Sequence, residues 1–281
     1  MTQTQIFPVL VLGTTEIYQT QTSNEGIVKS SHQMIGGNGL CSALAASKSV
    51  QTALISGIGK DIIAELPQLK TVPNLNLDYI IQYPDLNSFF YKSVLDQNGV
   101  EISGEPVFNC HRDFLNSQIS KAPECQILHC SGTDPDFYLN NISNLKFRFL
   151  SVAVIDYFLS KKLASVIKLM NLADIIFLNQ AEYAILQDQI DFADKILIVT
   201  SGENGLNIYQ NEQVFHFEAE IISTTNTVNA GDVLAGSMLA SFSLVSDLTN
   251  ISQSQYLKMV YLAKTEVKKL LQQHSFYRIK L

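Results

Sequence analysis

Short apolar runs alternate with longer segments of helical spacing along most of the chain. The runs rich in Val, Ile and Leu span residues 7–13, 51–59, 125–132, 149–156, 173–179 and 194–202. Such runs are typical of parallel strands that are buried on both faces. The segments with helical spacing between them span residues 39–50, 160–172 and 179–189. The alternation predicts an α/β fold with a mostly parallel central sheet and helices on both faces.

Two regions interrupt this alternation. Residues 17–35 and 85–103 lack a helical period, are rich in Ser, Thr and aromatic residues, and carry turn signals at Asn24 to Gly26 and at Asn98-Gly99. We expect them to form β-hairpins that meet as a small sheet. That sheet could be a lid over a site, an edge extension or the contact of a homodimer. Without internal repeats or linkers, the chain is expected to be a single domain over residues 1–281 with these lid segments inserted.

The composition excludes several classes of protein. Hydrophobic residues make up 46% of the 281 residues and charged residues only 16%, which is typical of a globular protein. The net charge of -7 argues against binding of nucleic acid. The N-terminal segment has no basic region and no long apolar stretch, and no run has the length of a membrane helix. A cytoplasmic protein with no membrane partner is therefore expected.

The cysteines give no sign of a disulfide framework or a metal centre. They lack the CxxC spacing of such sites, and no histidines stand at metal-site intervals. They are expected to be reduced thiols, most of them small buried residues. The cysteines are Cys41, Cys110, Cys125 and Cys130.

The most informative stretch runs from Thr224 to Phe242, where Asn229, Ala230, Gly231 and Asp232 precede an apolar helical segment. Small residues allow a ligand to approach the backbone, and the free N–H groups of a helix start attract anions. A carboxylate there is useful when it accepts the proton of an attacking hydroxyl, as in phosphoryl transfer. The alternative is an ordinary helix start, with Asn229 as N-cap and Asp232 in the first turn.

Further motifs share the character of sites at strand ends. Gly36-Gly37 leads into a helix and permits hinge movement and close approach of the backbone. Asn179 ends an apolar run and is followed three residues later by Glu182. Thr200, Gly202 and Gly205 form a turn suited to nucleotide phosphates at the end of another run.

In their order and spacing, these motifs resemble those of the ribokinase-like (PfkB) carbohydrate kinases. The resemblance covers roughly residues 7–245 and implies a three-layer αβα sandwich with a small β-sheet lid. It implies that Asp232 is the catalytic base and that Asn229, Ala230 and Gly231 form the anion hole. It also implies ATP and Mg²⁺ as cofactors. The other implied roles are metal and phosphate binding by Asn179 and Glu182, ATP binding by Thr200, Gly202, Gly205 and Thr227, and substrate binding by Gly36, Gly37, Glu16, Tyr18 and Cys41.

The chain departs from the family pattern mainly at the positions that bind the sugar substrate in the family. Glu16 and Tyr18 replace the usual Asn and Asp after the first strand, and Cys41 replaces another Asn. Phe158 and Ser160 alter a further motif, and Asn226 replaces an aspartate, which makes a bound K⁺ doubtful. A site stripped of hydrogen-bonding groups holds a polyhydroxylated sugar poorly. The alternative for Cys41 is a small core residue.

Aromatic residues accompany these changes. Tyr18, with Phe89, Phe90 and Tyr91, could form a wall that stacks on a planar group such as a nucleobase. The alternative is packing between lid and core, or a dimer contact.

The leading hypothesis is an ATP-dependent kinase that phosphorylates a hydroxymethyl group of a small sugar or nucleoside-like substrate. The alternative is a nucleotide- or metabolite-binding protein on the same fold whose catalysis is impaired. A dinucleotide-dependent dehydrogenase is disfavoured, because no Gly-x-Gly-x-x-Gly follows the first apolar run.

Overall fold

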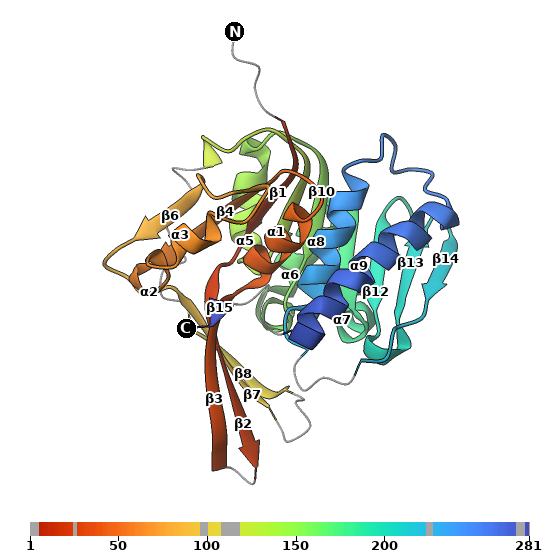
Figure 1. Cartoon of the computed structure of the whole chain (residues 1–281). Coiled ribbons are helices and arrows are strands. Elements are labelled where there is room, and N and C mark those ends of the chain that lie inside the picture. The colour runs from red at the N-terminus through yellow and green to blue at the C-terminus, as the bar shows by residue number, and fades with distance from the viewer. Residues whose placement is uncertain are drawn as a thin grey trace.

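The computed structural model describes residues 6–24, 27–95, 101–107, 119–222, 227–273 and 279–280. Its main sheet has the strand order β14-β13-β12-β11-β10-β9-β1-β4-β5, with β6 paired to β4 (Figure 1). The strands are β1 (Phe7–Gly13), β4 (Thr52–Gly59), β5 (Leu75–Asn76), β6 (Ile80–Tyr83), β9 (Cys125–Ser131), β10 (Phe147–Ala153), β11 (Ile175–Asn179), β12 (Ile196–Thr200), β13 (Leu206–Gln210) and β14 (Gln213–Phe217).

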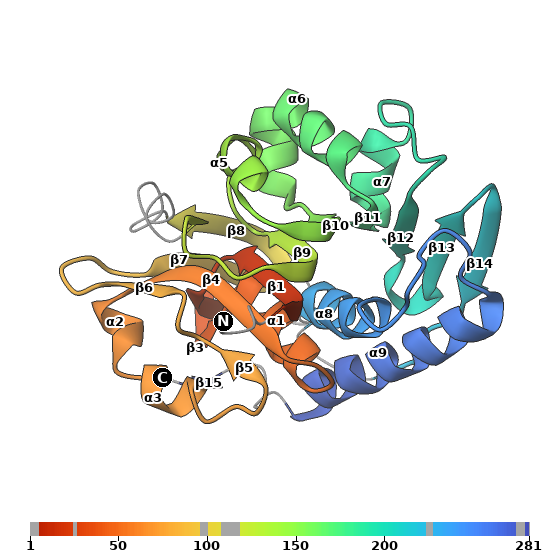
Figure 2. The ribbon, with the colours of Figure 1, turned by 90° about the horizontal axis from the view of Figure 1, so that it is seen from above.

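Helices cover both faces of this sheet, which gives the three layers that the sequence predicts (Figure 2). One face carries α1 (Asn38–Ser47), α8 (Ala230–Phe242) and α9 (Gln253–Gln273), and the other carries α5 (Pro135–Asn141), α6 (Asp156–Leu172) and α7 (Gln180–Leu186). The short helices α2 (Lys60–Ile63) and α3 (Leu66–Leu69) follow β4. Burial on both faces explains why every residue of β4 is buried and why its sequence shows no alternation.

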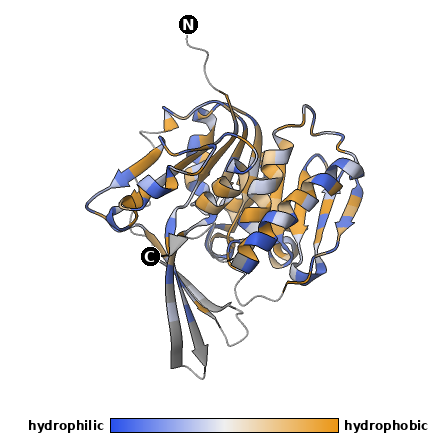
Figure 3. Ribbon diagram, in the orientation of Figure 1, coloured by the Kyte–Doolittle hydropathy of each residue, from blue (hydrophilic) through white to orange (hydrophobic). Residues whose placement is uncertain are grey.

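The strands from β5 to β12 pair in parallel, whereas β12, β13 and β14 pair in antiparallel fashion at one edge. Hydrophobic residues are concentrated in the strands of the main sheet and on the helix surfaces that face it (Figure 3). Because parallel strands share a direction, their carboxyl ends meet along one edge of the sheet. Ligands of open α/β sheets bind at that edge.

A second sheet projects from the main body and has the order β15-β3-β2-β7-β8 (Figure 1). Its strands are β2 (Glu16–Asn24), β3 (Ile27–Gly36), β7 (Phe89–Leu95), β8 (Glu101–Val107) and β15 (Ile279–Lys280). The two segments expected to be β-hairpins thus meet in one sheet through the parallel pair β2–β7. The turn signals at Gly26 and at Asn98-Gly99 lie outside the described residues.

Some predicted boundaries were wrong. The apolar run 149–156 was expected to be a strand throughout, but β10 ends at Ala153, and Asp156 begins α6, where its acidic side chain suits the first helical turn. The hairpin β13–β14 was not predicted. Its turn places Asn211 and Glu212 at positive φ of 50° and 64°, and Asn at the first of these positions is a known hairpin signal. Cys41, Cys125 and Cys130 are buried, and Cys110 lies outside the described residues.

Helices α1 and α8 touch at Gly236, and this contact yields a prediction on stability. A Cβ atom at Gly236 would lie 2.1 Å from the carbonyl oxygen of Ser42, which is backbone and cannot rotate away. Alanine would gain about 1 kcal/mol of helix propensity, but overpacking costs about 3 kcal/mol. We therefore expect Gly236→Ala to lower the free energy of unfolding by about 2 kcal/mol and Tm by about 5 °C, as measured by urea and thermal unfolding.

The matched control lies on the same helix. No atom stands within 4 Å of the position that a Cβ atom would take at Gly231, so Gly231→Ala should keep the wild-type Tm or raise it slightly. Equal unfolding curves for Gly236→Ala and Gly231→Ala would contradict the prediction.

Candidate active site

A cavity opens at the carboxyl ends of the parallel strands, where the second sheet meets the main sheet. Its volume of about 300 Å³ lies within the range of small-molecule sites. The main sheet contributes the ends of β10, β11 and β12, and α8 contributes its first turn. The second sheet contributes Glu16, Tyr18, Phe89 and Tyr91. Polar groups from both sheets thus converge on one space.

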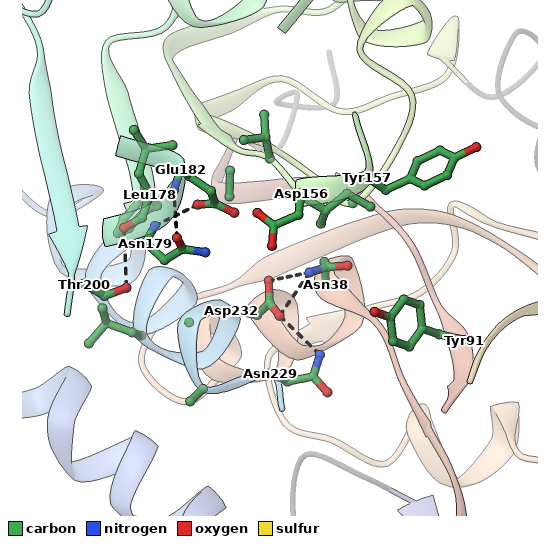
Figure 4. A pocket seen from close by; sticks show the side chains of 18 of the residues that line it. Asn38, Tyr91, Asp156, Tyr157, Leu178, Asn179, Glu182, Thr200, Asn229 and Asp232 are labelled. Atoms are coloured by element: carbon green, nitrogen blue, oxygen red, sulfur yellow. Dashed lines mark hydrogen bonds between the residues drawn. The ribbon is translucent and has the colours of Figure 1, made fainter. Parts of the chain in front are cut away.

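The first turn of α8 presents Asp232 to this cavity, and two amides hold its carboxylate (Figure 4). Asn38 Nδ2 donates to Oδ1 at 3.1 Å and to Oδ2 at 3.2 Å, and Asn229 Nδ2 donates to Oδ2 at 3.2 Å. Burial raises the pKa of Asp232 above its usual value, while the bonds from Asn38 and Asn229 lower it. Asp232 is therefore a half-buried carboxylate with its oxygens fixed by hydrogen bonds.

Asn229 is the N-cap of α8 but does not cap it with its side chain. Its φ of 65° is left-handed, a conformation that Asn tolerates better than most residues. This geometry directs the side-chain amide to Asp232, so the ordinary side-chain cap considered from the sequence is not formed. The amide of Ala230 donates to the carbonyl of Thr227 at 3.1 Å. Gly231 has open space where a side chain would stand, which leaves the backbone accessible.

Glu16 lies at the start of β2 and is 3% exposed. Burial, together with the nearby charge of Asp232, raises the pKa of its carboxyl from 4.5 to about 8. Glu16 is therefore mainly a neutral carboxylic acid at neutral pH and can donate a hydrogen bond, which a carboxylate cannot.

Asn179 and Glu182 form a capping box at the start of α7. The backbone N–H of Asn179 donates to Glu182 Oε2 at 2.7 Å, and that of Glu182 donates to Asn179 Oδ1 at 2.9 Å. Burial raises the pKa of Glu182 to about 8, and the charges of Asp156 and Asp232 add to this effect. Both residues line the cavity, and the carboxyl groups of Glu182 and Asp156 approach each other there (Figure 4).

The predicted nucleotide residues divide into two groups. Thr200 and Thr227 line the cavity, and Thr200 Oγ1 donates to the carbonyl of Leu178 at 3.4 Å. Gly202 and Gly205 lie in the adjoining turn, at positive φ of 57° and 86°, and do not line the cavity. A Cβ atom at Gly205 would lie 2.1 Å from the carbonyl oxygen of Phe217, so the turn itself accounts for that glycine.

The predicted substrate residues are divided in the same way. Tyr18 lines the cavity, and its ring centroid lies 4.9 Å from that of Tyr91. Gly36 ends β3, Gly37 precedes α1 at a φ of 107°, and neither lines the cavity. Cys41 lies on α1 and is fully buried in the hydrophobic core. The structure therefore favours the interpretation of Cys41 as a core residue.

Asn38 and Gly132 are among the cavity residues that were not singled out from the sequence. Asn38 follows Gly37 and contacts Asp232, from which it is separated by 194 positions. Gly132 follows β9 at a φ of 78°, beside Asn38. A Gly at the end of a buried apolar run is a signal that could have pointed to Gly132. Nothing local to Asn38 predicts its partner.

The sequence profile of the pfkB family of carbohydrate kinases matches residues 8–253, most of the chain. The chain belongs to the pfkB family of carbohydrate kinases. As a PfkB-family member it is a phosphotransferase with an alcohol group as acceptor. No curated protein sequence matches it significantly.

Solved structures with the same fold are similar to this PfkB-family chain over nearly its whole length. The nucleoside kinase of Methanocaldococcus jannaschii is 15% identical with a TM-score of 0.77, covering 96% of this chain and 93% of its own. The nucleoside kinase of Burkholderia thailandensis in complex with inosine is 14% identical with a TM-score of 0.77 and coverage of 96% and 92%. The adenosine kinase of Sinorhizobium meliloti is 12% identical with a TM-score of 0.73 and coverage of 95% and 94%. At these identities the likeness shows the fold alone.

The described residues of the PfkB-family chain bear on the binding of membranes and metal ions. None of its described helices is both long and apolar enough to cross a membrane. In the same part of the chain, no group of three or more His, Cys, Asp and Glu side chains is arranged to hold a metal ion.

Proposed function

We propose that the protein transfers the γ-phosphoryl group of ATP to a hydroxymethyl group of a small sugar or nucleoside-like substrate. The observation that carries this proposal is the Asp232 carboxylate, held by two amides at the N-terminus of α8 and facing the cavity between the sheets. Asp232 accepts the proton of the substrate hydroxyl. In the same step, the hydroxyl oxygen bonds to the γ-phosphorus while the bond from that phosphorus to ADP breaks. The backbone of residues 229–231 forms the anion hole for the transferred group.

PfkB kinases use ATP with Mg²⁺, and the carboxyl groups of Glu182 and Asp156 line this cavity. Magnesium is usually held by one or two carboxylates, with phosphates and waters completing its octahedron. Glu182 is 7% exposed, and its carboxyl has an elevated pKa that a divalent cation would lower. Glu182 and Asp156 would therefore hold the ion, with Asn179 fixing Glu182 through the capping box. Bound Mg²⁺ would neutralise charge on the phosphates during transfer.

The second sheet favours a nucleoside over a free sugar as acceptor. Tyr18 on β2 and Tyr91 on β7 are register partners in the parallel pair, and both line the cavity. Their rings are tilted by 39° and form an aromatic surface above the polar floor. A nucleobase has the flat π face that such a surface recognises, whereas a free pentose lacks it.

Loss of one ring should change acceptor preference. Tyr18→Leu and Tyr91→Leu are each expected to raise KM for a nucleoside about tenfold, because stacking contributes about 1 to 1.5 kcal/mol. KM for ATP and kcat should stay near wild type. The measurement is a comparison of KM for a nucleoside and for its free pentose. Tyr261→Leu, an exposed residue of α9, is the control. Equal losses for both acceptors would count against the aromatic surface.

ADP release from Mg-ATP over a panel of nucleosides, pentoses, hexoses and sugar phosphates tests the proposed function. The panel is run with the wild type and with Asp232→Asn. ADP formation that depends on an acceptor and disappears in the variant supports the kinase. Tight nucleotide binding with no acceptor-dependent ADP would instead support the catalytically impaired binding protein, which the replacements at Glu16 and Tyr18 make the second candidate.

A further inference from the structure

Asn38 lies at the first position of α1 and reaches the first turn of α8. Its Nδ2 atom lies 3.1 Å from Asp232 Oδ1 and 3.2 Å from Asp232 Oδ2, so one amide bridges both carboxylate oxygens (Figure 4). The bridge joins the N-termini of two helices that are far apart in sequence. Ser42, one turn further along α1, adds a bond from its hydroxyl to the backbone carbonyl of Asp232 at 3.2 Å.

The hydrogen bonds from Asn38 favour one protonation state of Asp232. An Asn Nδ2 group can only donate hydrogen bonds, so it favours the state of its partner that accepts at both oxygens. That state is the carboxylate, because a protonated carboxyl carries a hydrogen on one oxygen. The Asn38 bonds therefore oppose the effect of burial on Asp232.

Other carboxyl groups near Asp232 make such a donor important. Glu16 on β2, Asp156 on α6 and Glu182 on α7 also line the cavity, and negative charge on any of them disfavours ionisation of Asp232. Amide donors from Asn38 and Asn229 face the carboxylate from α1 and from the start of α8. No cation is bonded to Asp232 among the side chains that the structure describes.

Gly132 makes room for Asn38. A Cβ atom at this position would lie 2.7 Å from Asn38 Oδ1 and 2.8 Å from Thr14 Oγ1. The φ of Gly132 is 78°, which further restricts the site to glycine. Gly132→Ala should therefore displace the Asn38 side chain without altering its chemistry.

We propose that Asn38 is a positioning residue for the phosphoryl transfer, which orients the Asp232 carboxylate and favours its charged form. This inference rests on the proposed role of Asp232 as the base. It concerns the group that holds the base, so it can fail while the proposed function stands.

The test compares pH profiles of kcat for the wild type and Asn38→Leu, which keeps similar bulk without a donor. Asn38→Leu removes the hydrogen bonds to the charged Asp232 carboxylate. We expect this loss to lower kcat about 10- to 100-fold at neutral pH. The acid limb of the profile should move up by about one pH unit, so part of the activity returns at higher pH. KM for ATP should stay near wild type. Gly132→Ala should move the acid limb in the same direction.

Asn141→Leu is the control that distinguishes the proposed positioning role of Asn38 from a merely structural role. Asn141 is also buried and donates its amide to the carbonyl of Phe137 at 2.8 Å, on α5 and away from the cavity. Its replacement should lower stability but leave the acid limb in place. If Asn38→Leu also leaves the acid limb in place while Asp232→Asn is inactive, the inference about Asn38 fails and the proposed function stands.

A second measurement does not depend on turnover. The carboxyl ¹³C resonance of Asp232, assigned by its loss in Asp232→Asn, can be titrated in the wild type and in Asn38→Leu. We expect a higher midpoint in the variant by about one unit. Identical midpoints would overturn the inference, whether or not an acceptor has been found. Absence of acceptor-dependent ADP with a shifted midpoint would overturn the proposed function alone.

Discussion

Asp232→Asn is expected to lower kcat by about 10³-fold or more, because it removes the group that we propose accepts the substrate proton. An amide has no basic lone pair at the position where the hydroxyl would transfer its hydrogen. The substitution is nearly isosteric, so the lost activity reports on chemistry rather than on shape. The measurement is acceptor-dependent ADP formation, followed by single-turnover kinetics to separate the chemical step from product release.

ATP binding should survive the same substitution. The oxygen of the new amide can take the place of Asp232 Oδ2, which accepts from both Asn38 and Asn229 at 3.2 Å. Removal of a negative charge beside the phosphates does not weaken nucleotide affinity. Calorimetric titration with ATP should give a Kd near that of the wild type. A variant with wild-type turnover would show that another group is the base.

Glu16→Gln is expected to change how stability depends on pH. In the folded protein the pKa of Glu16 is raised from 4.5 to about 8 by burial and by Asp232. Between these pH values the folded chain keeps a proton that the unfolded chain has released. Because the folded state binds more protons, the free energy of unfolding falls as pH rises through this window. Below pH 4.5 Glu16 is protonated in both the folded and the unfolded state, so its ionisation no longer affects the free energy of unfolding.

Glutamine is neutral at every pH and lacks this dependence. Glu16→Gln should therefore be more stable than the wild type at pH 8 by on the order of 4 kcal/mol, and by little at pH 4.5. Urea unfolding at several pH values measures the difference. Glu218→Gln, at an exposed position, is the control and should follow the wild-type slope. Parallel pH dependences for wild type and Glu16→Gln would show that Glu16 is not a buried acid.

The strand pattern could be predicted from the sequence because each parallel strand is buried on both faces. The run 7–13 coincides with β1, and the run 51–59 differs from β4 by one residue. The run 149–156 misled because Val154 and Ile155 are apolar but lie beyond the strand, between β10 and α6. Hydrophobicity alone therefore cannot mark where a buried strand ends.

From the residues alone, contacts within the candidate site could be predicted only between neighbours in sequence, whereas the family resemblance brought in distant residues such as Glu16, Tyr18 and Thr200. Asn229 and Asp232 lie in one helical turn, and Asn179 and Glu182 form one capping box. The bridge from Asn38 to Asp232 depends on how α1 and α8 pack, which no local pattern encodes. The elevated pKa of Glu16 likewise arises from burial between two sheets.

In the proposed function, the phosphoryl-transfer residues and the residues that select the acceptor lie on different sheets. Asp232, Asn179 and Thr200 belong to the main sheet and its helices, whereas Tyr18 and Tyr91 belong to strands β2 and β7 of the second sheet. Mutation can therefore vary one set without rebuilding the other. Exchange of β7 and of β2 beyond Glu16 between PfkB-family members is accordingly a rational way to transfer a new acceptor preference to an unchanged phosphoryl-transfer centre.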